Sequence, residues 1–251
     1  MNSPAEILQI WIGNSVKKAT LPTFKMILLG IAAGIYIGFG CHGFLLSTAA
    51  AETVFEAGIA KLVGSALFPL GLMLVVLCGG ELFTGNNLLT LGILDKKITP
   101  AQLLKSWIVV YFANFAGSLF LAVLLAHSGL YTGAAGERAI AVATSKVSAP
   151  FMGLVIKGIL CNILVVLAVW FAAGAKDMIG KIWAIWFPIT MFVFSGFEHC
   201  VANMTYIPLG MMLGAEVSIG QLLIANLLPV TIGNLIGGAV IMPLIYYYSY
   251  R

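Results

Sequence analysis

The chain has 251 residues, of which 61% are hydrophobic and only 9% are charged, and its net charge is +4. Soluble domains carry about 25% charged and about half apolar residues, so this composition excludes a soluble protein. It predicts a polytopic membrane protein in contact with lipid, and the small net charge does not indicate a nucleic-acid partner. The four cysteines lack Cys-x-x-Cys spacing, so neither a disulfide framework nor a metal site is expected, and nothing points to a cofactor.

The N-terminal segment, residues 1–25, is predicted to contain an amphipathic helix over residues 4–20. Its apolar side carries Trp11, and its end carries Lys17 and Lys18. A helix of this kind lies along the lipid headgroups. Packing of the same side against the rest of the protein is an equal alternative.

Six hydrophobic segments are long enough to cross the membrane, which takes about 20 apolar residues in a helix. Residues 49–61 and 128–148 are read as connections, and the second of these is polar. The predicted all-α protein is a single channel domain over residues 1–251. Its predicted spans are Met26–Thr48, Leu62–Leu94, Pro100–His127, Ala149–Gly174, Ile182–Leu213 and Ile219–Tyr247.

The second and fifth spans are too long for one simple crossing, and each contains polar residues and glycine near its middle. In the second span these residues lie between Gly79 and Asn87, and in the fifth they lie between Ser195 and Asn203. We therefore predict that both helices are broken inside the membrane. Non-helical backbone at that depth has to be buried in protein or line a wet cavity.

The two breaks share a pattern in which a Gly precedes a Glu by two positions and an Asn follows that Glu by five. The two glutamates of this pattern, Glu81 and Glu198, are 117 residues apart. A second similarity links Asn114–Ser118 to Asn234–Gly238 at an offset of 120 residues. These offsets predict two repeats of three spans each, residues 26–127 and 149–247, in inverted orientation. Broken helices in inverted repeats indicate a substrate site near the membrane midplane.

The fifth span holds an ionisable pair, Glu198 and His199, inside a hydrophobic run. A charged side chain at the bilayer centre costs roughly 2.5–3.5 kcal/mol, so such residues suggest a functional site. The alternative is a polar cluster that only links neighbouring helices. The N-termini of half-helices in the breaks carry free N–H groups and a partial positive charge, which suits a small anion.

The distribution of lysine and arginine predicts that both termini lie in the cytoplasm, because basic residues accumulate in cytoplasmic loops. Nine basic residues flank the spans on the side of the termini and three flank them on the other side: Lys17, Lys18, Lys25, Lys96, Lys97, Lys105, Lys176, Lys181 and Arg251, against Lys61, Arg138 and Lys146. We expect the protein in the cell membrane.

Three segments resemble the formate/nitrite transporter family, namely Leu77–Gly85, Gly158–Ala168 and Gly196–Met204. The resemblance covers almost the whole chain, and the chain is most similar to the hydrosulfide branch of that family. It implies a homopentamer of aquaporin-like protomers, each with its own pore for small monovalent anions such as formate, nitrite or hydrosulfide. The resemblance does not separate these anions, nor passive flow from proton-coupled transport.

The resemblance also assigns roles to residues. It makes Thr84 and His199 the polar pair at the centre of the pore, with Asn162, Asn203 and Lys146 also on the substrate pathway. The residues assigned to the hydrophobic constrictions are Leu72, Leu82, Phe68, Phe192 and Phe194. The residues expected to shape the two loops are Gly79, Glu81, Gly196 and Glu198, with the glutamates holding loop backbone. This chain departs from the family at Val166, where a Cys is usual, and at Lys157, an extra charge without an assigned role.

Constrictions of Leu and Phe exclude an ion without its water shell, because removing that water costs far more free energy than contacts with apolar side chains provide. We expect His199 to lower this cost by donating a hydrogen bond to the anion or by lending it a proton. Lys146, with Lys157 as a further candidate, is expected to raise the anion concentration at the outer mouth. A water channel would be expected to carry two Asn-Pro-Ala boxes, and an intramembrane enzyme would need a nucleophile with a base or a metal cluster. The sequence contains neither the Asn-Pro-Ala boxes of a water channel nor the catalytic or metal-binding group of an enzyme.

Overall fold

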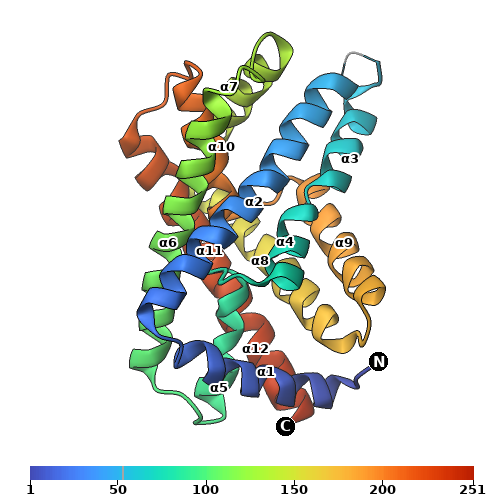
Figure 1. Ribbon diagram of the computed structural model, residues 1–251, viewed down its shortest axis with the longest axis vertical. Coiled ribbons are helices and arrows are strands. Elements are labelled where there is room, and N and C mark those ends of the chain that lie inside the picture. The colour runs from blue at the N-terminus through green and yellow to red at the C-terminus, as the bar shows by residue number, and fades with distance from the viewer. Residues whose placement is uncertain (53) are drawn as a thin grey trace.

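The computed structural model describes residues 1–52 and 54–251, and every regular element in them is a helix (Figure 1). Six helices are long and apolar enough to cross a membrane, as predicted. These six segments are Thr23–Ala51, Ala57–Gly79, Pro100–Ala126, Phe151–Gly174, Met178–Ser195 and Gln221–Tyr250.

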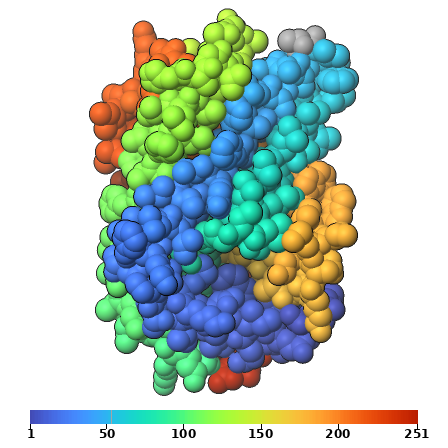
Figure 2. All heavy atoms as spheres, viewed as in Figure 1, coloured from blue at the N-terminus to red at the C-terminus, as the bar shows by residue number. Residues whose placement is uncertain are grey.

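Helix α1 (Pro4–Ala19) begins with a capping box in which Ser3 and Glu6 bond each other's backbone N–H groups. The helix lies across the end of the molecule that carries both chain termini (Figures 1 and 2). Its apolar side chains, among them Leu8, Trp11 and Ile12, are buried against the rest of the protein. Of the two expectations for this segment, the structure therefore shows packing against the protein itself.

Close helix crossings hold each half together. Helix α2 (Thr23–Ala51) packs on α6 (Pro100–Ala126), where a Cβ added to Gly117 would collide with the backbone of Ile31. In the second half α8 (Phe151–Gly174) packs on α11 (Leu228–Leu235), where a Cβ at Gly233 would collide with the backbone of Val155. Small residues allow such close approach inside a membrane.

The second span is broken, as predicted. It descends through α3 (Ala57–Leu67), α4 (Leu70–Leu74) and the π-helical turn η1 (Val75–Gly79). Gly79 has a φ of +90°, a left-handed conformation that favours glycine. After a non-helical stretch at residues 80–84, which we call the first break, the chain continues in η2 (Gly85–Leu89) and α5 (Thr90–Leu94).

The fifth span is broken in the same way. Helix α9 (Met178–Ser195) ends at Gly196, whose φ of +73° gives the left-handed cap typical of helix C-termini. Residues 196–199, the second break, lead into α10 (Cys200–Met212). The sixth span alternates π-helical and α-helical turns: η3 (Gln221–Leu227), α11, η4 (Ile236–Ile241) and α12 (Met242–Tyr250).

The segment between the third and fourth spans contains a helix that the sequence analysis described only as a polar connection. Helix α7 (Ala134–Val147) buries Ala139, Ala143 and Val147 on one side, and it packs against α10. These residues are four apart, the spacing of one helix face. The face consists largely of alanine, so its apolar periodicity is weak beside the polar residues around it.

Candidate functional site

A single asparagine holds the first break in place. The Nδ2 group of Asn114 donates to the carbonyls of Gly30 and Glu81, both at 2.8 Å, and its Oδ1 accepts from the N–H of Phe83 at 2.9 Å. One amide side chain thus satisfies two backbone groups of the first break and joins them to α2. Buried backbone groups without partners would be costly at this depth.

The second break is held in the same manner by Asn234. Its Nδ2 donates to the carbonyls of Gly158 and Glu198 at 2.8 and 2.9 Å, and its Oδ1 accepts from the N–H of Cys200 at 2.9 Å. The similarity between Asn114–Ser118 and Asn234–Gly238 revealed the repeat, but it gave no role to the two asparagines. The sequence did hold a signal for this role, because the two asparagines occupy equivalent positions in the two repeats. Each lies in the span that follows a broken helix.

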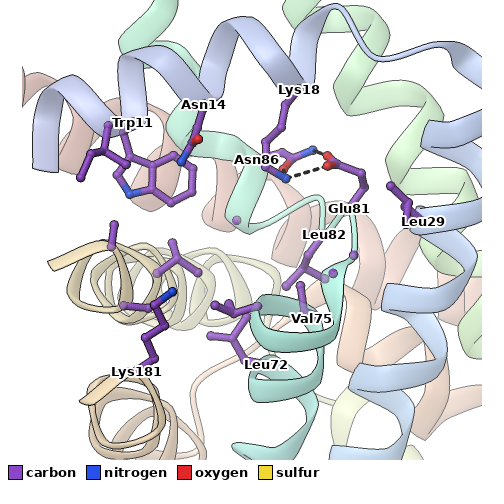
Figure 3. Close-up of a pocket in the computed structure, with 18 of the residues that line it drawn as sticks. Trp11, Asn14, Lys18, Leu29, Leu72, Val75, Glu81, Leu82, Asn86 and Lys181 are labelled. Atoms are coloured by element: carbon purple, nitrogen blue, oxygen red, sulfur yellow. Dashed lines mark hydrogen bonds and ion pairs between the residues drawn. The ribbon is translucent and has the colours of Figure 1, made fainter. Parts of the chain in front are cut away.

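Each break also carries a buried glutamate paired with a lysine and an asparagine. At the first break, the Oε1 atom of Glu81 lies 2.7 Å from Lys18 Nζ, and its Oε2 accepts from Asn86 Nδ2 at 2.6 Å (Figure 3). At the second break, Lys146 Nζ and Asn203 Nδ2 both lie near Glu198 Oε2, at 2.9 and 2.7 Å.

The expectation that the carboxylates of these two glutamates hold loop backbone is therefore wrong. The breaks are held by Asn114 and Asn234, whereas each carboxylate binds an ammonium and an amide side chain. The physical reason is that a buried carboxylate needs an opposite charge to offset its desolvation. Lys18 was not predicted as part of the site, because its partner Glu81 lies 63 positions away in the sequence.

His199 lies at the start of α10 and joins the two breaks. Its Nδ1 accepts a hydrogen bond from the N–H of Ala202 at 3.1 Å, which caps the helix. Its Nε2 lies 2.8 Å from Thr84 Oγ1. An Nδ1 that accepts carries no proton, so this network assigns the proton of a neutral imidazole to Nε2. The imidazole thereby presents an N–H donor on the side of Thr84.

Three cavities lie in series through the chain. A proximal vestibule of about 490 Å³ opens between α1, α4 and α8, near the chain termini. A central chamber of about 10 Å³ follows, and a distal vestibule of about 300 Å³ lies on the opposite side. Leu72 and Leu82 line both the proximal vestibule and the chamber. Phe68, Phe192 and His199 line both the chamber and the distal vestibule.

Apart from His199, the residues shared by neighbouring cavities are all apolar. Phe68 and Phe192 meet edge to face, with ring centroids 5.5 Å apart, and the Phe192 ring stacks on the His199 imidazole. Leu72 and Leu82 are both 2% exposed. The central chamber therefore has an imidazole at its wall and apolar side chains at both ends.

A model of the formate/nitrite transporter family matches residues 5–248. The chain belongs to this family. It is 41% identical to the "Probable formate transporter" of Methanothermobacter thermautotrophicus over 99% of this chain and 97% of that one. It is 35% identical to the "Formate channel FocA" of Escherichia coli (strain K12), over 98% of this chain and 94% of that one. Together with its six spans, this makes it a multi-pass membrane protein.

Solved structures of the formate/nitrite transporter family have the same fold. An "FNT family ion channel" superposes with a TM-score of 0.89 at 31% identity, covering 98% of this chain and 99% of that one. A "Pentameric formate channel with formate bound" gives a TM-score of 0.81 at 34% identity, covering 91% and 97%.

Some residues that the family resemblance assigned to the pathway lie elsewhere. Phe194 is exposed on α9, with Lys61 Nζ 5.7 Å from its ring centroid, so it does not form a constriction. Asn162 lines none of the three cavities, because its Nδ2 bonds Asn87 Oδ1 and the carbonyl of Asn234, both at 2.8 Å. Asn203 and Lys146 line the distal vestibule.

The sequence analysis also missed part of the chamber wall. Ile37, Val165 and Ile189 complete the lining of the central chamber in this member of the formate/nitrite transporter family. All three are aliphatic residues within membrane spans, where such residues are common. Nothing in their sequence context distinguishes them from residues that face lipid.

Proposed function

We propose that the protein is a channel for small monovalent anions and that formate is its best-supported substrate. The observation that carries this proposal is the series of three cavities joined by apolar constrictions, with His199 at the chamber between them. The names of the two relatives support formate, since both are formate transporters or channels.

His199, which lines the chamber, lowers the energy of an anion there, and Thr84, which lines none of the three cavities, acts through its hydrogen bond to His199. The Nε2–H of His199 is bonded to Thr84 Oγ1 at 2.8 Å, and an entering anion takes the place of that hydroxyl as acceptor. Charge-assisted hydrogen bonds are stronger than neutral ones, which offsets part of the lost hydration.

Hydrosulfide is the second candidate substrate. The chamber volume of about 10 Å³ has room for about one water molecule, so a smaller anion needs less widening of the chamber than a larger one. Hydrosulfide is smaller than formate. The size of the chamber thus favours hydrosulfide, whereas the similarity to formate transporters favours formate.

A panel of fluxes in proteoliposomes tests the proposed function. Purified protein is reconstituted in neutral lipid, and entry of formate, nitrite and hydrosulfide is compared with entry of glycerol and water. We expect anion flux well above that of protein-free vesicles and no added glycerol flux. Flux measured with and without a pH gradient separates passive flow from proton coupling. Water or glycerol flux without anion flux would overturn the proposal.

Leu82→Val tests the proximal constriction. Removing one methylene from a side chain that borders both the chamber and the proximal vestibule widens the passage. We expect lactate flux to rise more than hydrosulfide flux, by about threefold or more, since one methylene is worth roughly 1 kcal/mol. Leu88→Val removes the same group from a buried leucine outside the cavity linings. Equal changes for all anions would remove Leu82 from the pore wall.

The proposed assembly is a homopentamer in the cell membrane with both termini in the cytoplasm. A relative at 34% identity is titled a pentameric channel, and it covers 91% of this chain. Native mass spectrometry in mild detergent is expected to show five chains of 26.6 kDa each. A monomer that is stable and still transports anions would show that the assembly is dispensable.

A further inference from the structure

The proximal vestibule is bordered by a buried hydrogen-bond donor that has no acceptor. Trp11 lines this vestibule and is 7% exposed, and its Nε1–H has no hydrogen-bond partner within residues 1–52 and 54–251. A buried donor without an acceptor lowers the stability of the fold, so such a group calls for an explanation. Anchoring of α1 does not provide one, because the ion pair of Lys18 with Glu81 holds the helix without this N–H.

Asn14 lies one helical turn further along α1 and lines the same vestibule. Its side-chain amide has no hydrogen-bond partner in the part of the chain that the structure describes. Figure 3 shows Trp11 and Asn14 projecting from α1 toward the space that the side chain of Lys181 enters from α9. Two neutral N–H donors and one ammonium group thus border one cavity. The wall that α8 contributes to this cavity is apolar and consists of Val169, Ala172 and Ala173.

The inverted repeat shows that the scaffold does not require the two donors of α1. Helices α1 and α7 each carry a lysine that pairs with the glutamate of one break, so they occupy equivalent places in the two halves. Counted back from these lysines, Trp11 corresponds to Ala139. Asn14 corresponds in the same way to Val142, which lines the distal vestibule. The second half therefore has apolar side chains where the proximal vestibule has donors.

We propose that Trp11 and Asn14 form an oxyanion site in the proximal vestibule, which binds formate or nitrite through directed N–H hydrogen bonds and discriminates against hydrosulfide. This site rests on the proposed function and names the class of anion that the vestibule prefers. The two oxygen atoms of formate can accept from two donors at once, whereas sulfur is a weak hydrogen-bond acceptor. A bound oxyanion also supplies the acceptor that the Nε1–H of Trp11 lacks.

Charge alone does not produce this discrimination. The ammonium group of Lys181 attracts monovalent anions alike, whatever their acceptor atoms, whereas hydrogen bonds depend on the type and direction of the acceptor. The small chamber favours hydrosulfide by size, so a preference for oxyanions at the vestibule acts in the opposite direction.

The test uses the double variant Trp11→Phe/Asn14→Val, which keeps an aromatic ring and gives position 14 the residue found at the equivalent place on α7. The concentration dependence of flux is measured for formate and for hydrosulfide in proteoliposomes of neutral lipid. We expect the half-saturating concentration to rise about three- to tenfold for formate and less than about twofold for hydrosulfide, because only the oxyanion loses strong hydrogen bonds.

The matched control is Trp186→Phe. This substitution also removes an indole N–H, but that N–H donates to the carbonyl of Ala66 at 3.0 Å, and Trp186 lines none of the three cavities. The ratio of the two half-saturating concentrations should therefore keep its wild-type value. Equal changes for formate and hydrosulfide in the double variant would overturn the oxyanion site.

Binding is observed directly by NMR on protein with isotope-labelled tryptophan in nanodiscs. The indole N–H signal of Trp11 is assigned by its absence from Trp11→Phe. Titration with formate is expected to shift this signal, and titration with hydrosulfide is expected to shift it less. A signal that formate does not move would mean that only water reaches this donor, which would overturn the site while leaving the channel proposal intact. Absence of anion flux in the wild type would instead overturn the channel proposal, so the two failures are distinguishable.

Discussion

His199→Asn is expected to lower anion flux by about ten- to a hundredfold at every pH between about 5 and 8. Asparagine has no nitrogen that reaches as far as Nε2, so the donor 2.8 Å from Thr84 Oγ1 is lost. A hydrogen bond to a charged group is worth about 1.5–3 kcal/mol, which corresponds to that range of flux. The imidazole of His199 is neutral in its hydrogen-bond network, because Nδ1 accepts from the N–H of Ala202 and Nε2 carries the proton, so the expected loss of flux does not depend on titration of this residue.

The substitution is suited to this position because asparagine is among the best helix N-caps. Its Oδ1 can replace His199 Nδ1 as acceptor for the N–H of Ala202, so α10 should remain capped and the protein should fold and assemble. Flux is measured by stopped-flow in proteoliposomes over that pH range, with Thr84→Ala as a milder comparison that keeps the imidazole. Wild-type rates over that whole range would reduce His199 to a packing residue.

Gly117→Val is expected to prevent normal packing of α2 on α6. A Cβ at Gly117 would collide with the carbonyl oxygen of Ile31 and would lie 2.8 Å from its carbonyl carbon. These are backbone atoms, so the two helices have to separate along their length. Overpacking costs typically about 1–3 kcal/mol and occasionally more. We expect a fall in melting temperature of at least about 5 °C in detergent, or a loss of assembled protein.

The control for this prediction is a glycine in open space. Gly13→Ala on α1 meets no atom within 4 Å, and alanine is a better helix former than glycine, so its melting temperature should equal or exceed that of the wild type. If Gly117→Val melted like Gly13→Ala, the close crossing of α2 and α6 would not contribute to stability.

The breaks in the second and fifth spans could be predicted because their cause is local. Gly79 and Gly196 adopt left-handed conformations that favour glycine, and a polar cluster inside a long apolar run cannot continue as a lipid-facing helix. The repeat offsets then placed Glu81 and Glu198 in matching positions. These features depend on residue type and spacing, which the sequence displays directly.

The partners of these residues could not be predicted, because each pairing joins segments far apart in the chain. Lys18 reaches Glu81 only because α1 lies under the first break, and Asn114 reaches Glu81 only because α2 and α6 cross closely. The prediction that Phe194 forms part of a constriction was wrong for a related reason. It lies two residues after Phe192, and on a helix residues two apart point in different directions, so only one of the pair can face the chamber.

The hydrogen bonds that Asn114 and Asn234 make at the two breaks also affect how quickly the pore opens. Asn114 and Asn234 each bond three backbone groups, so the breaks cannot shift without losing several hydrogen bonds at once. Loop and domain rearrangements take microseconds to milliseconds. With the breaks fixed, we expect the rings of Phe68 and Phe192 to move instead, since they turn about side-chain bonds. We therefore predict that turnover is limited by dehydration of the ion rather than by a rocking cycle of the two halves.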